Sequence, residues 1–290
     1  MIPERDQEVL QDLAEAAAHA KVSFFIVGAG ARLLTHDWPR GIAGGRTTTD
    51  WDIAIRVGSW SEFERFKAAL LAHKRGAVFM AGRAPHQILH RSAGVPVDVI
   101  PFGLLEMPTG AITWPQGGPT MSVTVFSACE SMCRSIGLAS GLAVAAATVP
   151  ALVLMKAHAH VDRFAAGESR DLRDIDFLLR TYAGEQDDER VFDLGGDFIR
   201  SGKLLIEDAG AFLLGVDTAL KTPDALLTPL LDLIGQTADP FGAVISALVS
   251  RIWDEEEDLA RREAIRRRFA ALGLGLDNGV QRQRGVDSEE

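Results

Sequence analysis

The spacing of hydrophobic residues predicts helices and strands in alternation at the start of the chain. Apolar side chains recur at helical spacing over residues 4–20, and the apolar run 22–27 that follows is rich in strand-forming residues and ends in glycine. A second strand is predicted over 51–57. An amphipathic helix follows it, and Ser59 and Glu62 have the spacing of a capping box at its start. This part of the chain is therefore expected to be α/β.

The pattern then changes from short strands to long helices. Three further strand candidates lie near residues 77–80, 86–91 and 95–100. A loop rich in proline and glycine follows them over 101–119. Beyond about residue 127 helical periodicity dominates, and the one β signal there lies over 142–149. The predicted helical segments are 149–164, 170–183, 188–201, 204–220, 223–235 and 240–271. Residues 273–290 lack periodicity and apolar anchors. We therefore expect an α/β (α+β) core over residues 1–130, a helical domain over 131–272 and a flexible tail over 273–290.

Composition and charge are those of an ordinary globular protein. The 290 residues are 47% hydrophobic and 24% charged, which argues against a disordered or fibrous chain. A formal net charge of -10 argues against a general nucleic-acid binder and leaves room only for a local basic groove. The N-terminus is acidic where a signal peptide would be basic, and no run of about 18 apolar residues occurs. We therefore expect a cytoplasmic protein without a membrane partner.

Two aspartates one residue apart begin the second predicted strand. Asp50 and Asp52 would project from the same face of a strand, because strand side chains alternate. Two such carboxylates repel each other unless a divalent cation lies between them, and carboxylate oxygens are the ligands that hard cations prefer. As an alternative, both acids are solvated at a strand end or pair with Arg46 and Arg56, which is the more frequent explanation of a lone D-x-D. The pair alone does not decide between these interpretations.

Two other segments carry features that suit the same chemistry. Asp98 lies between Val97 and Val99 in a run that is otherwise core-facing, where an unpaired acid is costly, and it would add a third carboxylate on a neighbouring strand. The strand-to-helix segment 24–34 contains a G-x-G turn, which can present backbone N–H groups and a helix N-terminus to a phosphate. A glycine that serves only the turn is the alternative.

The order of these features resembles the nucleotidyltransferase superfamily of the DNA polymerase β type: a G-x-G turn, then an R-x-T-x-D-x-D segment, then an apolar-flanked aspartate. More narrowly, several segments resemble the AbiEii/AbiGii nucleotidyltransferase toxin family, at residues 27–34, 46–63, 95–103, 112–115 and 154–179. The resemblance implies a nucleotidyltransferase-type mixed β-sheet core, followed by a helical domain that completes the active-site cleft. It also implies binding of a nucleoside triphosphate (NTP) with two Mg²⁺ ions, or with Mn²⁺ in their place.

The resemblance also implies roles for single residues. The metal ligands would be Asp50, Asp52 and Asp98, with Asp98 near the attacking hydroxyl, and Lys156 would join them as a catalytic residue that contacts the triphosphate. The nucleotide would be bound by Gly28, Ala29, Gly30, Arg46, Thr48, Lys156, Asp171 and Asp174. Ala29 departs from the Gly-Ser or Gly-Gly turn of the superfamily, so a serine contact to phosphate is absent, and Thr48 or the backbone would replace it.

A second group of charges lies in the predicted helices. Lys156 and Arg163 are two helical turns apart and share a face, as Asp171 and Asp174 do on the next helix. The alternative to a nucleotide contact is a salt-bridge network between these helices, and it weighs most for Arg163 and Asp174.

The expected reaction is the metal-dependent transfer of a nucleoside monophosphate from an NTP to an acceptor hydroxyl, with loss of pyrophosphate. By resemblance the acceptor could be the 3′ end of tRNA, which would make the chain the toxin of a toxin–antitoxin or abortive-infection system with an antitoxin partner. One alternative is a nucleotidyltransferase that modifies a small molecule or a protein, which the acidic charge favours. Another is a non-catalytic nucleotide-binding module, although such a module has no need to hold three acids together.

Overall fold

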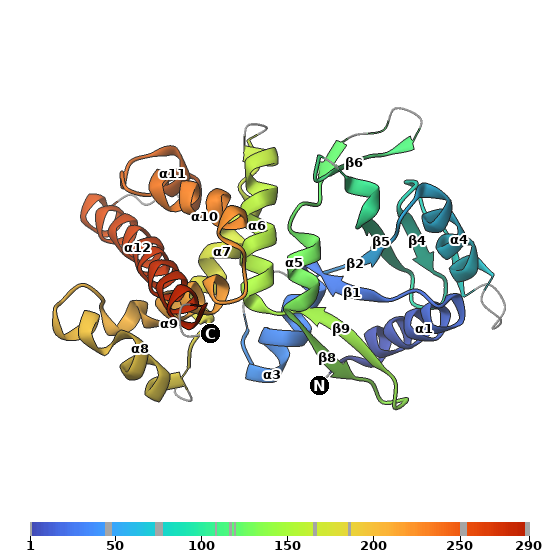
Figure 1. Cartoon of the computed structure of the whole chain (residues 1–290), viewed down its shortest axis with the longest axis horizontal. Coiled ribbons are helices and arrows are strands. Elements are labelled where there is room, and N and C mark those ends of the chain that lie inside the picture. The colour runs from blue at the N-terminus through green and yellow to red at the C-terminus, as the bar shows by residue number, and fades with distance from the viewer. Residues whose placement is uncertain are drawn as a thin grey trace. The chain divides into compact units, whose positions relative to one another are not determined.

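The computed structural model describes residues 2–43, 48–72, 78–107, 109–115, 118, 120–164, 167–184, 187–249 and 254–287. The chain divides into two compact units, Met1–Thr148 and Val149–Glu290 (Figure 1). The first unit contains the strands, and in the second unit the described residues form helices joined by turns and loops. The predicted mixed α/β core followed by a helical region is therefore confirmed.

The first unit is built on a seven-stranded mixed sheet in the order β3-β4-β5-β2-β1-β9-β8. The pairs β2–β5 and β1–β9 are parallel, and the other neighbours are antiparallel. The strands are β1 (Phe24–Val27), β2 (Trp51–Arg56), β3 (Phe79–Ala81), β4 (Gln87–His90), β5 (Val95–Phe102), β8 (Cys133–Gly137) and β9 (Ala143–Ala147). Two more strands pair with each other: β6 (Ala111–Thr113) lies inside the stretch predicted as a loop, and β7 (Thr120–Ser122) lies directly after it.

Two helices of the first unit form where the sequence pattern places them. Helix α1 (Glu4–Ala20) buries the apolar stripe Val9, Leu10, Leu13, Ala16 and Ala17. Helix α4 (Trp60–Leu71) begins with one of the two bonds of the predicted capping box, because Ser59 Oγ accepts from the Glu62 N–H at 3.3 Å. Glu62 Oε2 accepts from the Gly58 N–H at 2.6 Å, one residue before the N-cap. The remaining helical segments are α2 (Gly28–Arg32), the π-helical η1 (Leu33–Asp37), α3 (Trp38–Arg40), the 3₁₀ turn η2 (Leu104–Glu106) and α5 (Phe126–Ser131).

The boundary between the units lies later than the predicted residue 130. Strands β8 and β9 add to the edge of the sheet next to β1, where Phe25 pairs with Ala145, and therefore belong to the first unit. The segment Ala143–Ala147 is rich in alanine, which weakens its strand signal although Val144, Ala146 and Ala147 are buried.

The second unit consists of α6 (Val149–Phe164), α7 (Arg170–Thr181), α8 (Asp188–Arg200), η5 (Ile206–Asp208), α9 (Ala209–Ala219), α10 (Asp224–Gln236), α11 (Ala243–Leu248) and α12 (Glu255–Asp287). Helix α9 is almost entirely buried and packs against α12. No helix in the described ranges is long and apolar enough to cross a membrane.

The segment predicted as a flexible tail, 273–290, differs from that prediction over most of its length. Helix α12 continues to Asp287, and Leu276 within it is buried. A Cβ at Gly275 would lie 2.0 Å from the Phe212 carbonyl oxygen, and one at Gly215 would lie 2.2 Å from the Leu272 oxygen, so glycine lets the backbones of α9 and α12 touch. The glycines that suggest a loop in the sequence are thus what allows this helix to pack.

Candidate active site

The two buried-strand aspartates lie side by side in the sheet. Asp52 on β2 and Asp98 on β5 are register partners in a parallel pair, and directly paired residues project from the same face of a sheet. Asp52 is also paired with Val27 at the end of β1, and Asp98 with Gln87 at the start of β4. One row of residues across four strands therefore brings the G-x-G turn, two carboxylates and an amide to one place.

The opposite face of β2 is covered by α1. Trp51 is buried, and its Nε1–H donates to Asp6 Oδ1 of α1 at 3.2 Å. Because side chains alternate along a strand, the half-buried Asp52 faces away from α1. The carboxylates thus occupy the face that this helix leaves uncovered.

The two glycines of the turn have different neighbours. Gly28 has a left-handed φ of +63, and a Cβ at this position would lie 2.3 Å from Asp52 Oδ2. Gly30 packs on the other side, where a Cβ would lie 2.5 Å from Cε3 of Trp51. Glycine is therefore required at Gly28 both by backbone conformation and by contact with the carboxylate, and at Gly30 by the indole ring. Ala29 between them is half-buried.

Two residues that the sequence did not single out surround Asp98. Gln87 Nε2 donates to Asp98 Oδ1 at 3.0 Å, and His86 Nε2 lies 4.0 Å from Asp98 Oδ2. The Arg83 N–H donates to Gln87 Oε1 at 3.3 Å, which fixes the orientation of the amide with its nitrogen toward Asp98. Gln87 is thus held at both ends of its amide, and the Asp98 side chain, 24% exposed, keeps Oδ2 on the side away from Gln87.

Asp50 lies just before β2 and is held by Thr48. The Thr48 hydroxyl lies 2.6 Å from the Asp50 carbonyl oxygen and 2.9 Å from Asp50 Oδ1, and it can donate to one of them at a time. Over the described ranges, Glu8, Asp12 and His90 form the one group of three metal-ligating side chains whose atoms all lie within 4.8 Å of one another. The structure thus pairs Asp52 with Asp98 and leaves Asp50 turned to Thr48.

The arginines that offered an alternative partner for the aspartates have separate outcomes. Arg56 donates to Glu130 Oε2 from both Nε and Nη2, at 3.0 and 2.6 Å, so it forms an ion pair elsewhere. Arg46 lies outside the described residues.

The charged group of the second unit forms a salt-bridge network between α6 and α7. Lys156 Nζ donates to Asp171 Oδ1 at 3.1 Å and to Asp174 Oδ2 at 2.6 Å. Arg163 Nη1 lies 3.1 Å from Asp171 Oδ2, and the Asp171 side chain is only 2% exposed. These contacts are the ones that the salt-bridge alternative requires, and a contact of Lys156 with a triphosphate stays a prediction.

Comparisons with known proteins add little beyond these residues. No protein-family model and no curated protein matches the chain, so the AbiEii/AbiGii resemblance also stays a prediction. Two solved structures align with most of it. The Elizabethkingia meningoseptica CdnE cyclic dinucleotide synthase with GTP and Apcpp shares 13% identity over 89% of each chain, with a TM-score of 0.27. The Bradyrhizobium diazoefficiens CD-NTase CdnG in complex with GTP shares 13% identity over 97% of this chain and 99% of that chain, with a TM-score of 0.22. TM-scores this low establish neither a shared fold nor a shared activity.

Proposed function

We propose that the chain is a metal-dependent nucleotidyltransferase that transfers a nucleoside monophosphate from an NTP to an acceptor hydroxyl. The observation that carries this proposal is the pairing of Asp52 with Asp98 on parallel strands, with Gly28 against the Asp52 carboxylate. Two acids fixed side by side repel each other unless a cation or a proton compensates them.

The donor set fits a hard divalent cation. Asp52 and Asp98 offer carboxylate oxygens from rigid neighbouring strands, which suits Mg²⁺ or Mn²⁺, and Asp50 would join them by rotation away from Thr48. Two such ions would supply positive charge to the triphosphate and to the acceptor oxygen. The space beside Gly28, which a Cβ would fill, lies against the same carboxylate.

The protein residues then have distinct roles in the proposed transfer. The acceptor oxygen forms a bond to the α-phosphorus as the bond from that phosphorus to the bridging oxygen breaks, and pyrophosphate leaves with the bonding electrons. Asp98 lies near the acceptor hydroxyl and accepts its proton, while Gln87 holds the other carboxylate oxygen in place.

The remaining predicted residues complete the nucleotide site in this proposal. By the motif resemblance, Lys156 offsets charge on the leaving phosphates. The nucleotide is bound by Gly28, Ala29, Gly30, Arg46, Thr48, Lys156, Asp171 and Asp174. The acceptor is the finer part of the proposal. The motif resemblance favours the 3′ end of tRNA, in a cytoplasmic toxin controlled by an antitoxin, whereas the net charge of -10 favours a small molecule or a protein as acceptor.

Incubation with each α-labelled NTP, Mg²⁺ and either total RNA, protein or small-molecule extract tests the proposal. We expect label in one acceptor fraction, and a label in the tRNA band would select the toxin hypothesis. Asp52→Asn and Asp98→Asn should abolish labelling. Asp197→Asn, at a side chain that is 92% exposed on α8, is the matched control and should label normally. NTP binding without transfer to any fraction would instead identify a nucleotide-binding module.

A further inference from the structure

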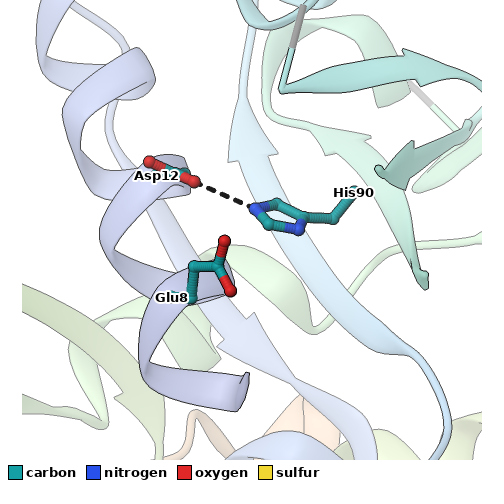
Figure 2. A group of neighbouring side chains, drawn as sticks. All are labelled: Glu8, Asp12 and His90. Carbon is teal, nitrogen blue, oxygen red and sulfur yellow. Dashed lines mark hydrogen bonds and ion pairs between the residues drawn. The ribbon is translucent and has the colours of Figure 1, made fainter. Parts of the chain in front are cut away.

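A second cluster of metal-ligating side chains lies on the α1 side of the sheet. Figure 2 shows Glu8 and Asp12, one turn apart on α1, facing His90 at the end of β4. Gln87 pairs with Asp98, and His90 lies three residues later on the same strand, so alternation places His90 on the opposite face from the aspartates. The cluster is therefore separate from the proposed nucleotide site and does not rest on the proposed function.

The three side chains are already close enough for one ion to draw them together. His90 Nε2 lies 3.0 Å from Asp12 Oδ2, and one ligand atom from each of the three residues lies within 4.8 Å of the others. His90 is 0% exposed and Asp12 is 7% exposed, so both are held by their surroundings. Glu8 is exposed and can move its carboxylate the remaining distance by a change of rotamer.

We propose that Glu8, Asp12 and His90 form a binding site for a divalent first-row transition-metal ion, with Zn²⁺ as the best representative. One imidazole nitrogen with two carboxylate oxygens is a donor set that such ions bind at about 2.0–2.2 Å, with water in the open position. The imidazole distinguishes this site from the proposed carboxylate site on the other face, because Mg²⁺ prefers oxygen ligands.

An ion can reach this cluster from solvent. A cavity of about 290 Å³ is lined by Glu8, Gln11, Asp12, Val78 and Ser92. It is separate from another cavity of the first unit, of about 450 Å³. Two of the three proposed ligands thus face an open space, and the buried His90 lies behind them.

The hydrogen bonds around His90 show what an ion would have to replace. In the structure His90 Nδ1 accepts from the Ala93 N–H at 3.3 Å, so Nε2 carries the proton that is shared with Asp12. Binding of the ion at Nε2 requires the single imidazole proton to shift from Nε2 to Nδ1, so the Ala93 N–H loses its acceptor and Ser92 Oγ, at 3.4 Å, can accept from Nδ1. Ser92 also donates to Glu8 Oε1 at 2.7 Å and so links the histidine to the third ligand.

Calorimetric titration of the full chain with Zn²⁺, in saturating Mg²⁺, tests this site. We expect one Zn²⁺ per chain at this cluster, a rise in melting temperature, and NMR signals that show the His90 proton on Nδ1. Glu8→Gln removes one exposed ligand without affecting the core and should weaken Zn²⁺ binding by about tenfold or more. Glu4→Gln, at an exposed glutamate one turn earlier on α1, is the matched control and should bind Zn²⁺ like the wild type.

Asp52→Asn separates this proposal from the proposed function, because it removes a carboxylate on the other face and should leave this Zn²⁺ binding intact. Equal Zn²⁺ affinity of the wild type and Glu8→Gln would overturn the proposal. So would a His90 proton that stays on Nε2 at saturating Zn²⁺. Either outcome would leave His90 and Asp12 as a buried hydrogen bond that joins α1 to β4.

Discussion

Asp52 and Asp98 are paired in register on the parallel strands β2 and β5, so their carboxylates project from the same face of the sheet. Like charges so placed destabilise the protein in the absence of a compensating ion. The pairing therefore predicts that the two aspartates lower the stability of the ligand-free protein although the proposed reaction needs them. It also predicts that a bound metal ion with NTP makes them stabilising.

The double variant Asp52→Asn/Asp98→Asn should be at least as stable as the wild type without ligand, because it removes the repulsion. In the wild type, Mg²⁺ with NTP at a hundredfold excess over the dissociation constant should add about 2.7 kcal/mol of stability, and the variant should lose this gain. Calorimetric melting with and without ligand measures both effects. Unfolding of the ligand-free variant would show that the two acids stabilise the fold instead.

Gly28→Ala should destabilise the protein and disturb the carboxylate, because the new Cβ would lie 2.3 Å from Asp52 Oδ2 in a left-handed backbone. Gly41 provides a matched control, since it has a φ of +64 and a Cβ added there would meet no atom within 4 Å. Both alanine variants should lose about 1–2 kcal/mol from the backbone conformation. Only Gly28→Ala should also lose Mg²⁺–NTP binding, which titration calorimetry would measure. Equal ligand binding by both variants would contradict the placement of Gly28 in the nucleotide site.

Much of the sheet and of this carboxylate pair could be predicted from the sequence, because both follow from local pattern. The apolar runs around Asp52 and Asp98 mark buried strands, and an acid in such a run stands out. The surroundings of Asp98 could not be predicted in the same way. Contact with Gln87 depends on the register of β4 against β5, which no local pattern specifies.

The errors at the ends of the predicted domains have the same origin. In the sequence, Gly275 suggests the end of a helix. In the structure it lies within α12 and lets this helix contact the backbone of Phe212 on α9. The β signal predicted over 142–149 forms strand β9, and its pairing with β1 and β8, which places it in the first unit, depends on contacts that no local pattern specifies. Non-local contacts therefore decide both assignments.

Gln87 should act as a positioning residue for Asp98. Gln87→Met keeps the side-chain volume that packs against Gly82 but removes the donor to Asp98, and Gln87→Glu replaces the donor with a second negative charge. We expect kcat to fall by about tenfold or more in the methionine variant and further in the glutamate variant, with little change in KM for the NTP. Steady-state kinetics separate the two parameters. Wild-type kcat in Gln87→Met would limit Gln87 to packing.

Lys156→Met should lower stability by about 1–3 kcal/mol, because Asp171 is buried and would lose one of its two cationic partners. Asp171→Asn in the same chain should restore part of the loss, which a double-mutant cycle of denaturant unfolding would reveal. Lys203→Met, at an exposed lysine, is the control and should change stability by less than about 0.5 kcal/mol. NTP affinity decides the proposed role: if Lys156→Met binds NTP as the wild type does, Lys156 serves the salt-bridge network alone.

The buried His36 should make the stability of the first unit depend on pH. Burial, followed by the charges of Arg40 and Arg32, lowers the pKa of His36 from 6.5 to about 4. Between these values the unfolded chain binds a proton that the native state does not, so this contribution is present in full above pH 6.5 and is lost as the pH falls toward 4. A shift of this size corresponds to about 3 kcal/mol.

His36→Gln, which cannot titrate, isolates this effect. Denaturant unfolding between pH 4 and 7 should show a weaker loss of stability toward acid in the variant than in the wild type, because the variant lacks the proton uptake on unfolding. The neighbouring Asp37 remains in both proteins, and burial raises its pKa against the opposing charge of Arg32, so its contribution has the opposite sign at the acid end and cancels in the comparison. Parallel pH profiles for the two proteins would show that the pKa of His36 is the same in the folded and the unfolded chain.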